Sequence, residues 1–97
     1  MCCNYGKAYY NLGNVFSDLK RHEEARPAYV DAVQLMSADA NAHYNLGNEL
    51  DELGRHSDGL VEYEKAARFK PRNADIQFNL GNGYHRAQHV LKQENIC

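Results

Sequence analysis

The sequence predicts an all-α fold, an α-solenoid of antiparallel helix-turn-helix pairs. Three observations lead to this prediction. The motif YNLGN at residues 10–14 returns unchanged at residues 44–48 and returns as FNLGN at residues 78–82. Both intervals are 34 residues, a period typical of stacked helical repeats. The segments around each copy carry apolar and small residues at the spacing of amphipathic helices, so each repeat is expected to contribute a helical pair.

The first repeat contains two helical patterns separated by the polar residues 20–22. Glu23 and Glu24 open the second pattern, where acidic side chains oppose the positive end of a helix. Pro27 falls inside this pattern, and a proline there removes one backbone hydrogen bond and crowds the residue four positions earlier. We therefore expect the second helix to start late, at about Glu24 or beyond, or to bend.

The second repeat shows the same two patterns with clearer boundaries. Gly54 is suited to end the first helix of this repeat, and Pro71 stops the second. Asn73 or a neighbour is expected to cap the helix that follows. Beyond Arg86 the pattern fades, and we expect either a short, poorly held sixth helix or a continuous extension of the fifth. The five predicted helices span residues 6–19, 23–36, 42–53, 58–69 and 74–86.

These patterns define one repeat array in residues 6–97, preceded by a short tail at residues 1–5. Within the array, the repeats span about 6–39, 40–73 and, for the incomplete third, 74–97. The glycines of the motif lie inside helices, where each costs about 1 kcal/mol relative to alanine. We expect close approach of the paired helix to compensate for this cost, because its facing positions are also small: Ala25 and Ala32, then Gly59 and Ala66.

Composition places the chain among ordinary globular domains. It has 97 residues, 43% hydrophobic and 25% charged, with a formal net charge of -2, which suits a single domain. Because nucleic-acid binding needs a basic face, we expect no nucleic-acid partner. No apolar run approaches the ~18 residues of a membrane-spanning helix, so we expect no membrane association.

The three cysteines, Cys2, Cys3 and Cys97, lie at the two ends of the chain. An odd number without internal spacing does not form a disulfide framework and fits a reducing compartment. The first residues also lack the charged and apolar regions of a secretory signal. We therefore expect an intracellular protein, cytoplasmic or nuclear.

The repeated motif resembles the tetratricopeptide repeat (TPR) family, whose unit carries Trp-x2-Leu-Gly-x2-Tyr, then Ala-x3-Phe, then Pro. The first unit here reads Tyr9-x2-Leu12-Gly13-x2-Phe16, followed by Ala25-x3-Tyr29. The other units follow in phase, with the last one incomplete. The resemblance implies a right-handed superhelix whose first helices line a concave groove, and a non-catalytic protein-interaction function as a scaffold or adaptor.

The resemblance and the helical spacing together place nine side chains in the groove as candidate peptide-binding residues. An asparagine amide offers both donors and an acceptor, which suits a peptide group, and aromatic rings give rigid contact area. The alternative is that the asparagines face water or bond to the next repeat. The nine residues form an aromatic row of Tyr10, Tyr44 and Phe78 and two amide rows, Asn11, Asn45 and Asn79, then Asn14, Asn48 and Asn82.

The charge of the predicted groove narrows the choice of partner. Four acidic residues face two basic ones, a formal -2 that favours a neutral to basic peptide. TPR proteins that clamp a chaperone's terminal carboxylate use basic side chains, which are missing here, so we expect no such clamp. The asparagine rows are closer to the superhelix of O-linked N-acetylglucosamine transferases. The charged groove residues are Asp18, Asp51, Glu52 and Asp75 against Lys7 and Arg86.

We found no catalytic, cofactor-binding or metal-ligating pattern and expect none of these functions. His22 and His56 occupy equivalent positions before the second helices and are interpreted as structural turn residues. His85 and His89 could share a helix face but lack further ligands. The alternative function is structural: a segment of a longer TPR array that stacks or self-associates through uncapped ends, the C-terminal end above all, because the last unit is incomplete.

Overall fold

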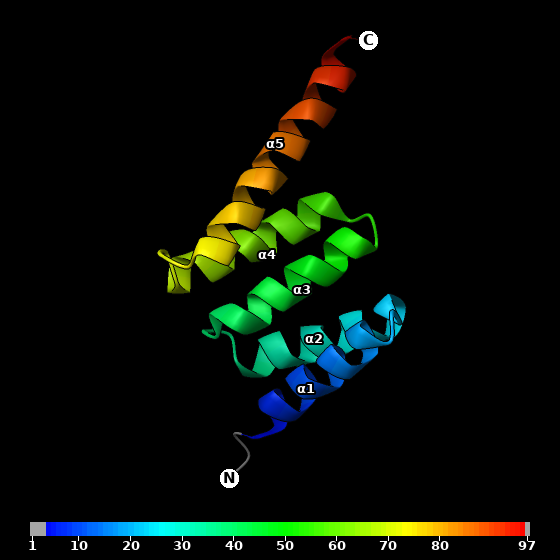
Figure 1. Ribbon diagram of the computed structural model, residues 1–97, viewed down its shortest axis with the longest axis vertical. Helices are drawn as coiled ribbons and strands as arrows, with labels where there is room; N and C mark the ends of the chain where they lie inside the picture. Colours follow the sequence, from blue (N-terminus) through cyan, green and yellow to red (C-terminus); the bar gives the residue numbers. More distant parts are fainter. Residues whose placement is uncertain (1–3, 97) are drawn as a thin grey trace.

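The computed structural model describes residues 4–96, with side chains for residues 5–86. Cys2, Cys3, Cys97 and the side chain of His89 therefore lie outside the described part. Residues 4–96 form five helices that stack in chain order, each antiparallel to the next (Figure 1). The prediction of an all-α solenoid is confirmed. The helices are α1 (Asn4–Asp18), α2 (His22–Leu35), α3 (Ala40–Glu52), α4 (His56–Phe69) and α5 (Ala74–Ile96).

The turns inside the first two repeats are formed by residues in the left-handed backbone region. Lys20 has φ 63° and Gly54 has φ 80°, and these positions are 34 residues apart. In each turn the next amide reaches back five residues, from Arg21 to Phe16 at 2.8 Å and from Arg55 to Leu50 at 2.8 Å. These bonds satisfy carbonyls that the end of a helix leaves free. The prediction that Gly54 ends a helix is confirmed.

Side-chain caps fix the starts of the third and fifth helices. The Asp39 carboxylate accepts a hydrogen bond from the amide of Ala42 at 3.1 Å. Asn73 Oδ1 accepts from the amide of Ile76 at 3.0 Å, which confirms the predicted cap. Each bond satisfies an amide that has no partner within the first helical turn. Beyond residue 86, α5 continues without a break to Ile96, so the continuous extension is the outcome observed (Figure 1).

The prediction of a late start for α2 is wrong. The helix begins at His22, and Pro27 is its sixth residue. The amides of Glu24 and Ala25 already bond to the carbonyl of Arg21, at 3.1 and 2.9 Å, so the first turn forms before the proline. Pro27 is exposed, and its missing amide affects one bond, to Glu23, which also lies at the surface.

The hydrophobic core lies between consecutive helices. One cluster joins Ala25 and Tyr29 of α2 to Leu46 and Leu50 of α3. A second joins α3, α4 and α5 through Ala40, Ala66 and Ile76. Every cluster spans a boundary between repeats, as expected for units that cannot bury their apolar faces alone.

Tyrosines of the second helices lie directly on the motif glycines of the first helices. A Cβ atom on Gly13 would be 2.7 Å from the Tyr29 ring, and one on Gly47 would be 2.7 Å from the Tyr63 ring. Because such a distance is far inside van der Waals contact, only glycine fits beneath each ring. At Gly13 and Gly47, the expected close approach of the paired helix is therefore made mainly by a tyrosine ring.

The motif leucines differ in burial, because Leu46 is 5% exposed whereas Leu12 is 43% exposed. Leu46 packs against α2, whereas no described helix precedes α1. The outer face of α1 therefore stays apolar and open.

None of the described helices combines the length and apolar character needed to cross a membrane.

Candidate functional site

The predicted amide rows form a hydrogen-bonded ladder between repeats. Asn45 Nδ2 donates to the Tyr10 hydroxyl at 2.9 Å and to Asn14 Oδ1 at 3.2 Å. One repeat later, Asn79 Nδ2 donates to the Tyr44 hydroxyl at 3.0 Å and to Asn48 Oδ1 at 3.2 Å. The same residues at the same spacing therefore make the same contacts. Asn14 and Asn48 therefore bond to the next repeat, which is the alternative stated for these asparagines, and Asn45 and Asn79 bond to the preceding one.

The tyrosines on the glycines join this ladder from the other side. The Tyr29 hydroxyl donates to Asn14 Oδ1, and the Tyr63 hydroxyl donates to Asn48 Oδ1 at 2.6 Å. Each of these two asparagine oxygens thus accepts from its own repeat and from the next one. An amide oxygen has two lone pairs, so both are used.

The ladder leaves a defined set of polar atoms for a ligand. The described contacts occupy both amide hydrogens of Asn45 and Asn79 but not their side-chain oxygens. For Asn14 and Asn48 they occupy the oxygens but not the amino groups. The surface therefore presents alternating acceptors and donors. The three other predicted residues, Asn11, Phe78 and Asn82, are exposed and belong to the two end helices.

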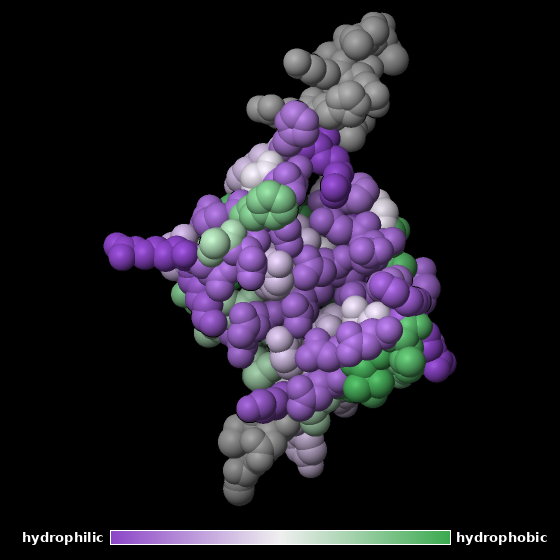
Figure 2. Space-filling model, in the orientation of Figure 1, coloured by the Kyte–Doolittle hydropathy of each residue, from purple (hydrophilic) through white to green (hydrophobic). Residues whose placement is uncertain are grey.

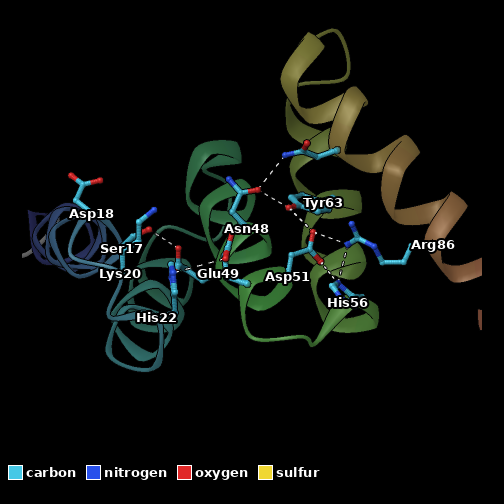
Figure 3. Close-up of a pocket in the computed structure, with 12 residues that line it drawn as sticks. Ser17, Asp18, Lys20, His22, Asn48, Glu49, Asp51, His56, Tyr63 and Arg86 are labelled. Carbon is cyan, nitrogen blue, oxygen red and sulfur yellow. Dashed lines mark hydrogen bonds and ion pairs between the residues drawn. The ribbon is translucent and has the colours of Figure 1, made fainter.

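A polar hollow of 620 Å³ adjoins the ladder (Figure 3). Its lining comes from α1, α3, α4 and α5 and from the residues around the first turn. A second hollow of 360 Å³ continues it and shares four lining residues. Four carboxylates face one lysine and one arginine, a formal balance of -2 with neutral histidines. The set differs from the predicted one, because Glu49 and Lys20 line the hollow whereas Asp75 and Lys7 do not. The charged lining residues are Asp18, Glu49, Asp51, Glu52, Lys20 and Arg86.

Glu49 forms the buried floor of this hollow, with only 3% of the residue exposed. Ser17 Oγ donates to Glu49 Oε2 at 2.6 Å, and His22 Nδ1 lies 2.6 Å from Glu49 Oε1 (Figure 3). A buried carboxylate needs such partners. In a serine–histidine catalytic pair the serine hydroxyl donates to the imidazole. Here Ser17 donates to the Glu49 carboxylate instead, and His22 contacts the same carboxylate.

At the opposite side of the hollow, Asp51 joins three helices. Its carboxylate lies 3.1 Å from the Tyr63 hydroxyl oxygen, whose single proton it shares with Asn48 Oδ1, and 3.1 Å from His56 Nδ1. Arg86 reaches across from α5 to within 3.5 Å of Asp51 and 2.9 Å of His56 (Figure 3). These contacts tie the third repeat to the second.

No group of three or more potential metal ligands occurs among the described residues.

Burial and the neighbouring carboxylates hold the two ladder tyrosines in their neutral form. Burial, followed by the charge of Glu49, raises the pKa of Tyr29 well above its usual range. Burial and Asp51 do the same to the pKa of Tyr63. Both hydroxyls therefore remain protonated, and able to donate, far into the alkaline range.

Sequence reasoning missed Glu49 and the role of the two repeated histidines. His22 and His56 were interpreted as turn residues, yet both line the hollow. The recurrence of these histidines at the repeat interval could have indicated a shared role. For Glu49 the indication in the sequence was weaker, because its counterparts 34 residues away are Val15 and Gly83. Glu49 does lie beside the core positions Leu46 and Leu50, where a carboxylate requires buried partners.

Comparisons with known proteins agree with this geometry. Residues 6–37 match a family model described as tetratricopeptide repeat, and residues 47–88 match one described as TPR repeat. The chain belongs to the tetratricopeptide repeat family. Each matched segment contains a copy of the repeated motif. No sequence match to a curated protein was found.

Solved TPR structures resemble this TPR protein over most of its length. The crystal structure of MamA is 28% identical, with a TM-score of 0.82, over 89% of this chain and 50% of that chain. YrrB, described as a TPR protein with an unusual peptide-binding site, is 29% identical, with a TM-score of 0.76, over 82% of this chain and 41% of that chain. This chain therefore spans about half the length of these structures.

Removal of the Tyr63 hydroxyl tests the ladder and its pH dependence. Tyr63→Phe should lower the free energy of unfolding by about 1 kcal/mol at neutral pH, because the contacts to Asn48 and Asp51 are lost. Above pH ~10, where an unfolded tyrosine ionises, the wild type should lose stability, because its unfolded state alone releases the proton. The difference in unfolding free energy between the wild type and Tyr63→Phe should then shrink. Urea unfolding at several pH values measures both effects, and parallel pH profiles would contradict the raised pKa.

Proposed function

We propose that this TPR protein is a non-catalytic interaction module that binds an extended, neutral to basic segment of another protein in its concave groove. The groove consists of the nine predicted residues together with the adjoining acidic hollow. The observation that carries the proposal is the row of unused amide groups on the ladder, bordered by carboxylates. TPR proteins bind protein partners, and the described peptide-binding site of YrrB supports the same use of this fold here.

The ladder supplies the hydrogen-bonding groups that an extended backbone requires. The amino groups of Asn14 and Asn48 suit peptide carbonyls, and the side-chain oxygens of Asn45 and Asn79 suit peptide amides. Packed helices lie about 10 Å apart, and an extended chain rises about 3.3 Å per residue. Each repeat then accounts for about three peptide residues.

The ladder also stiffens the groove before any ligand arrives. Asn45 and Asn79 are held by two hydrogen bonds each, so their oxygens are already oriented. A ligand therefore loses less free energy to the ordering of these side chains. The hydroxyls of Tyr10 and Tyr44 accept the ladder bonds, and the rings of these two tyrosines offer rigid apolar contact beside the amides.

The acidic hollow favours a basic side chain on the bound segment. Glu49 and Asp51 are already bonded to protein groups, whereas Asp18 is exposed and the Glu52 side chain is 63% exposed. The two exposed carboxylates are therefore the groups available to a lysine or arginine of the partner. Exposed pairs of this kind contribute modestly, and their effect weakens with salt.

Binding to an array of nine-residue peptides that differ only in charge tests this assignment. Basic and neutral peptides should bind better than acidic ones. Asp18→Asn with Glu52→Gln should weaken a basic peptide about fivefold at low salt. The matched control, Glu23→Gln with Asp31→Asn, makes the same charge change on α2, outside both hollows.

Three outcomes would contradict the proposal. The two groove substitutions and the two control substitutions could weaken binding equally, which would show that only the net charge of the protein matters. Acidic peptides could bind as well as basic ones. Asn48→Ala could also leave binding unchanged, although this variant removes an amino group that the proposal assigns to the peptide.

A second candidate function, assembly of TPR units, is favoured by the open face of α1. This face and the adjacent residues expose several large apolar side chains, and an apolar patch is visible at the α1–α2 end of the molecule (Figure 2). Leu46, the counterpart of Leu12, is covered by the preceding helix. Another copy could cover this face in the same way. The exposed residues are Tyr5, Tyr9, Leu12, Val15 and Leu19.

Sedimentation equilibrium over a range of concentrations distinguishes assembly from peptide binding alone. The assembly candidate predicts an average mass that rises with concentration and returns to the monomer value in Leu12→Gln. Val61→Gln, a change at a comparably exposed apolar residue on α4, serves as the matched control and should behave as wild type. A monomer at every concentration would exclude this candidate and leave the groove proposal unaffected.

A further inference from the structure

The third motif glycine lacks the aromatic ring that covers the other two. Positions 13 and 47 each lie beneath a tyrosine, so that a Cβ there would be 2.7 Å from the ring. Among the described side chains, a Cβ on Gly81 would meet nothing within 4 Å. The same residue in the same motif is therefore open on α5, although glycine inside a helix costs stability.

The residues around Gly81 are the counterparts of those that contact a tyrosine in the two complete repeats. Phe78 corresponds to Tyr10 and Tyr44, whose rings lie 6.1 Å and 5.9 Å from those of Tyr29 and Tyr63. Phe78 is 69% exposed, and Figure 2 shows an apolar area over the first half of α5.

Asn82 completes the arrangement. It corresponds to Asn14 and Asn48, whose oxygens accept the tyrosine hydroxyls, and it is exposed. Because residues three and four apart share a helix face, Phe78, Gly81 and Asn82 form one surface. We call this surface the α5 slot.

The chain does not turn back to fill the slot. In the first two repeats the residues at 20 and 54 have positive φ and reverse the chain. The next position in this series is Gln88, which lies inside the continuous helix α5. The second half of α5 instead extends beyond the other helices (Figure 1). The counterpart of Tyr63, moreover, is Cys97, which is not aromatic.

We propose that the α5 slot binds an amphipathic helix of a partner protein that carries a tyrosine, with small residues four positions before it and three positions after it. The slot continues the packing already present between α1 and α2 and between α3 and α4. Those interfaces define the ligand, because α2 carries Ala25, Tyr29 and Ala32 at this spacing, and α4 carries Gly59, Tyr63 and Ala66.

The chemistry of each ligand position follows from these two internal examples. The tyrosine ring covers Gly81 and meets Phe78 at its edge, and the hydroxyl donates to Asn82. Small residues let the two helix axes approach closely: a Cβ on Gly59 would lie 3.0 Å from the backbone oxygen of Gly47. A second folded copy cannot supply the helix, because Tyr29 and Tyr63 are each only 2% exposed.

A peptide with the sequence of α4, residues 56–69, with blocked ends, is a direct probe for the slot. Added to the isotopically labelled protein, it should shift the backbone amide signals of Phe78, Gly81 and Asn82 in a saturable way. A peptide in which alanine replaces the tyrosine is the matched control. It should bind at least about tenfold more weakly, since aromatic truncation removes the group that fills the slot.

Gly81→Ala separates docking from folding. In the free protein the added methyl meets none of the described side chains, so the melting temperature should not fall. In the complex the methyl would lie beneath the tyrosine ring, as at Gly13 and Gly47, and affinity should drop at least about tenfold. Asn82→Ala should weaken binding several-fold without unfolding the protein, since Asn82 is exposed.

Several results would overturn the proposal. Equal affinity of wild type and Gly81→Ala would show that the peptide binds elsewhere. Signal changes confined to α1 or to the acidic hollow would show the same, and no change at millimolar peptide would exclude the slot as a helix site. Concentration-dependent shifts of the Gly81 signal without peptide would assign the slot to a second copy.

Discussion

Each complete repeat depends on one contact, a tyrosine ring that lies directly on a helical glycine. The glycine lets the two helices approach until the ring touches the backbone, and the hydroxyl then reaches an asparagine on the same first helix. That asparagine accepts a second bond from the next repeat. The packing inside a repeat and the stacking between repeats therefore share a single atom, the oxygen of Asn14 or Asn48. Because the bonds share an acceptor, the loss of one is expected to affect the other.

The ladder also determines what the groove can offer a ligand. It consumes the amide hydrogens of Asn45 and Asn79 and leaves their oxygens, and it does the reverse at Asn14 and Asn48. The row of asparagines is thus both structural and available, through different atoms of each amide. Beside it, Glu49 accepts from Ser17 and lies against His22, and Asp51 lies within 3.5 Å of His56 and Arg86. Asp18 and Glu52 are more exposed, and the proposed function assigns these two carboxylates to a partner.

Much of the fold could be predicted from the sequence because its signals are local. The 34-residue period, the turn at Gly54 and the cap at Asn73 each depend on a few neighbouring residues, and all appear in the structure. Features that depend on the third dimension could not be predicted. Pro27 did not delay α2, because one bond at an exposed position is a small loss. Glu49 has no acidic counterpart in the other repeats, and its burial follows only from the meeting of α1, α2 and α3. The open face over Gly81 follows from the straight course of α5 through Gln88.

Hydrogen exchange at the asparagine side-chain amides, measured by NMR, tests most directly whether the ladder is built into the unliganded groove. The Nδ2 hydrogens of Asn45 and Asn79, each held by two acceptors, should exchange with water much more slowly than those of exposed Asn11. Replacement of Tyr10 by phenylalanine should accelerate exchange at Asn45 and leave Asn79 unchanged. Equal exchange at Asn11, Asn45 and Asn79 in the wild type would contradict the ladder and the groove that depends on it.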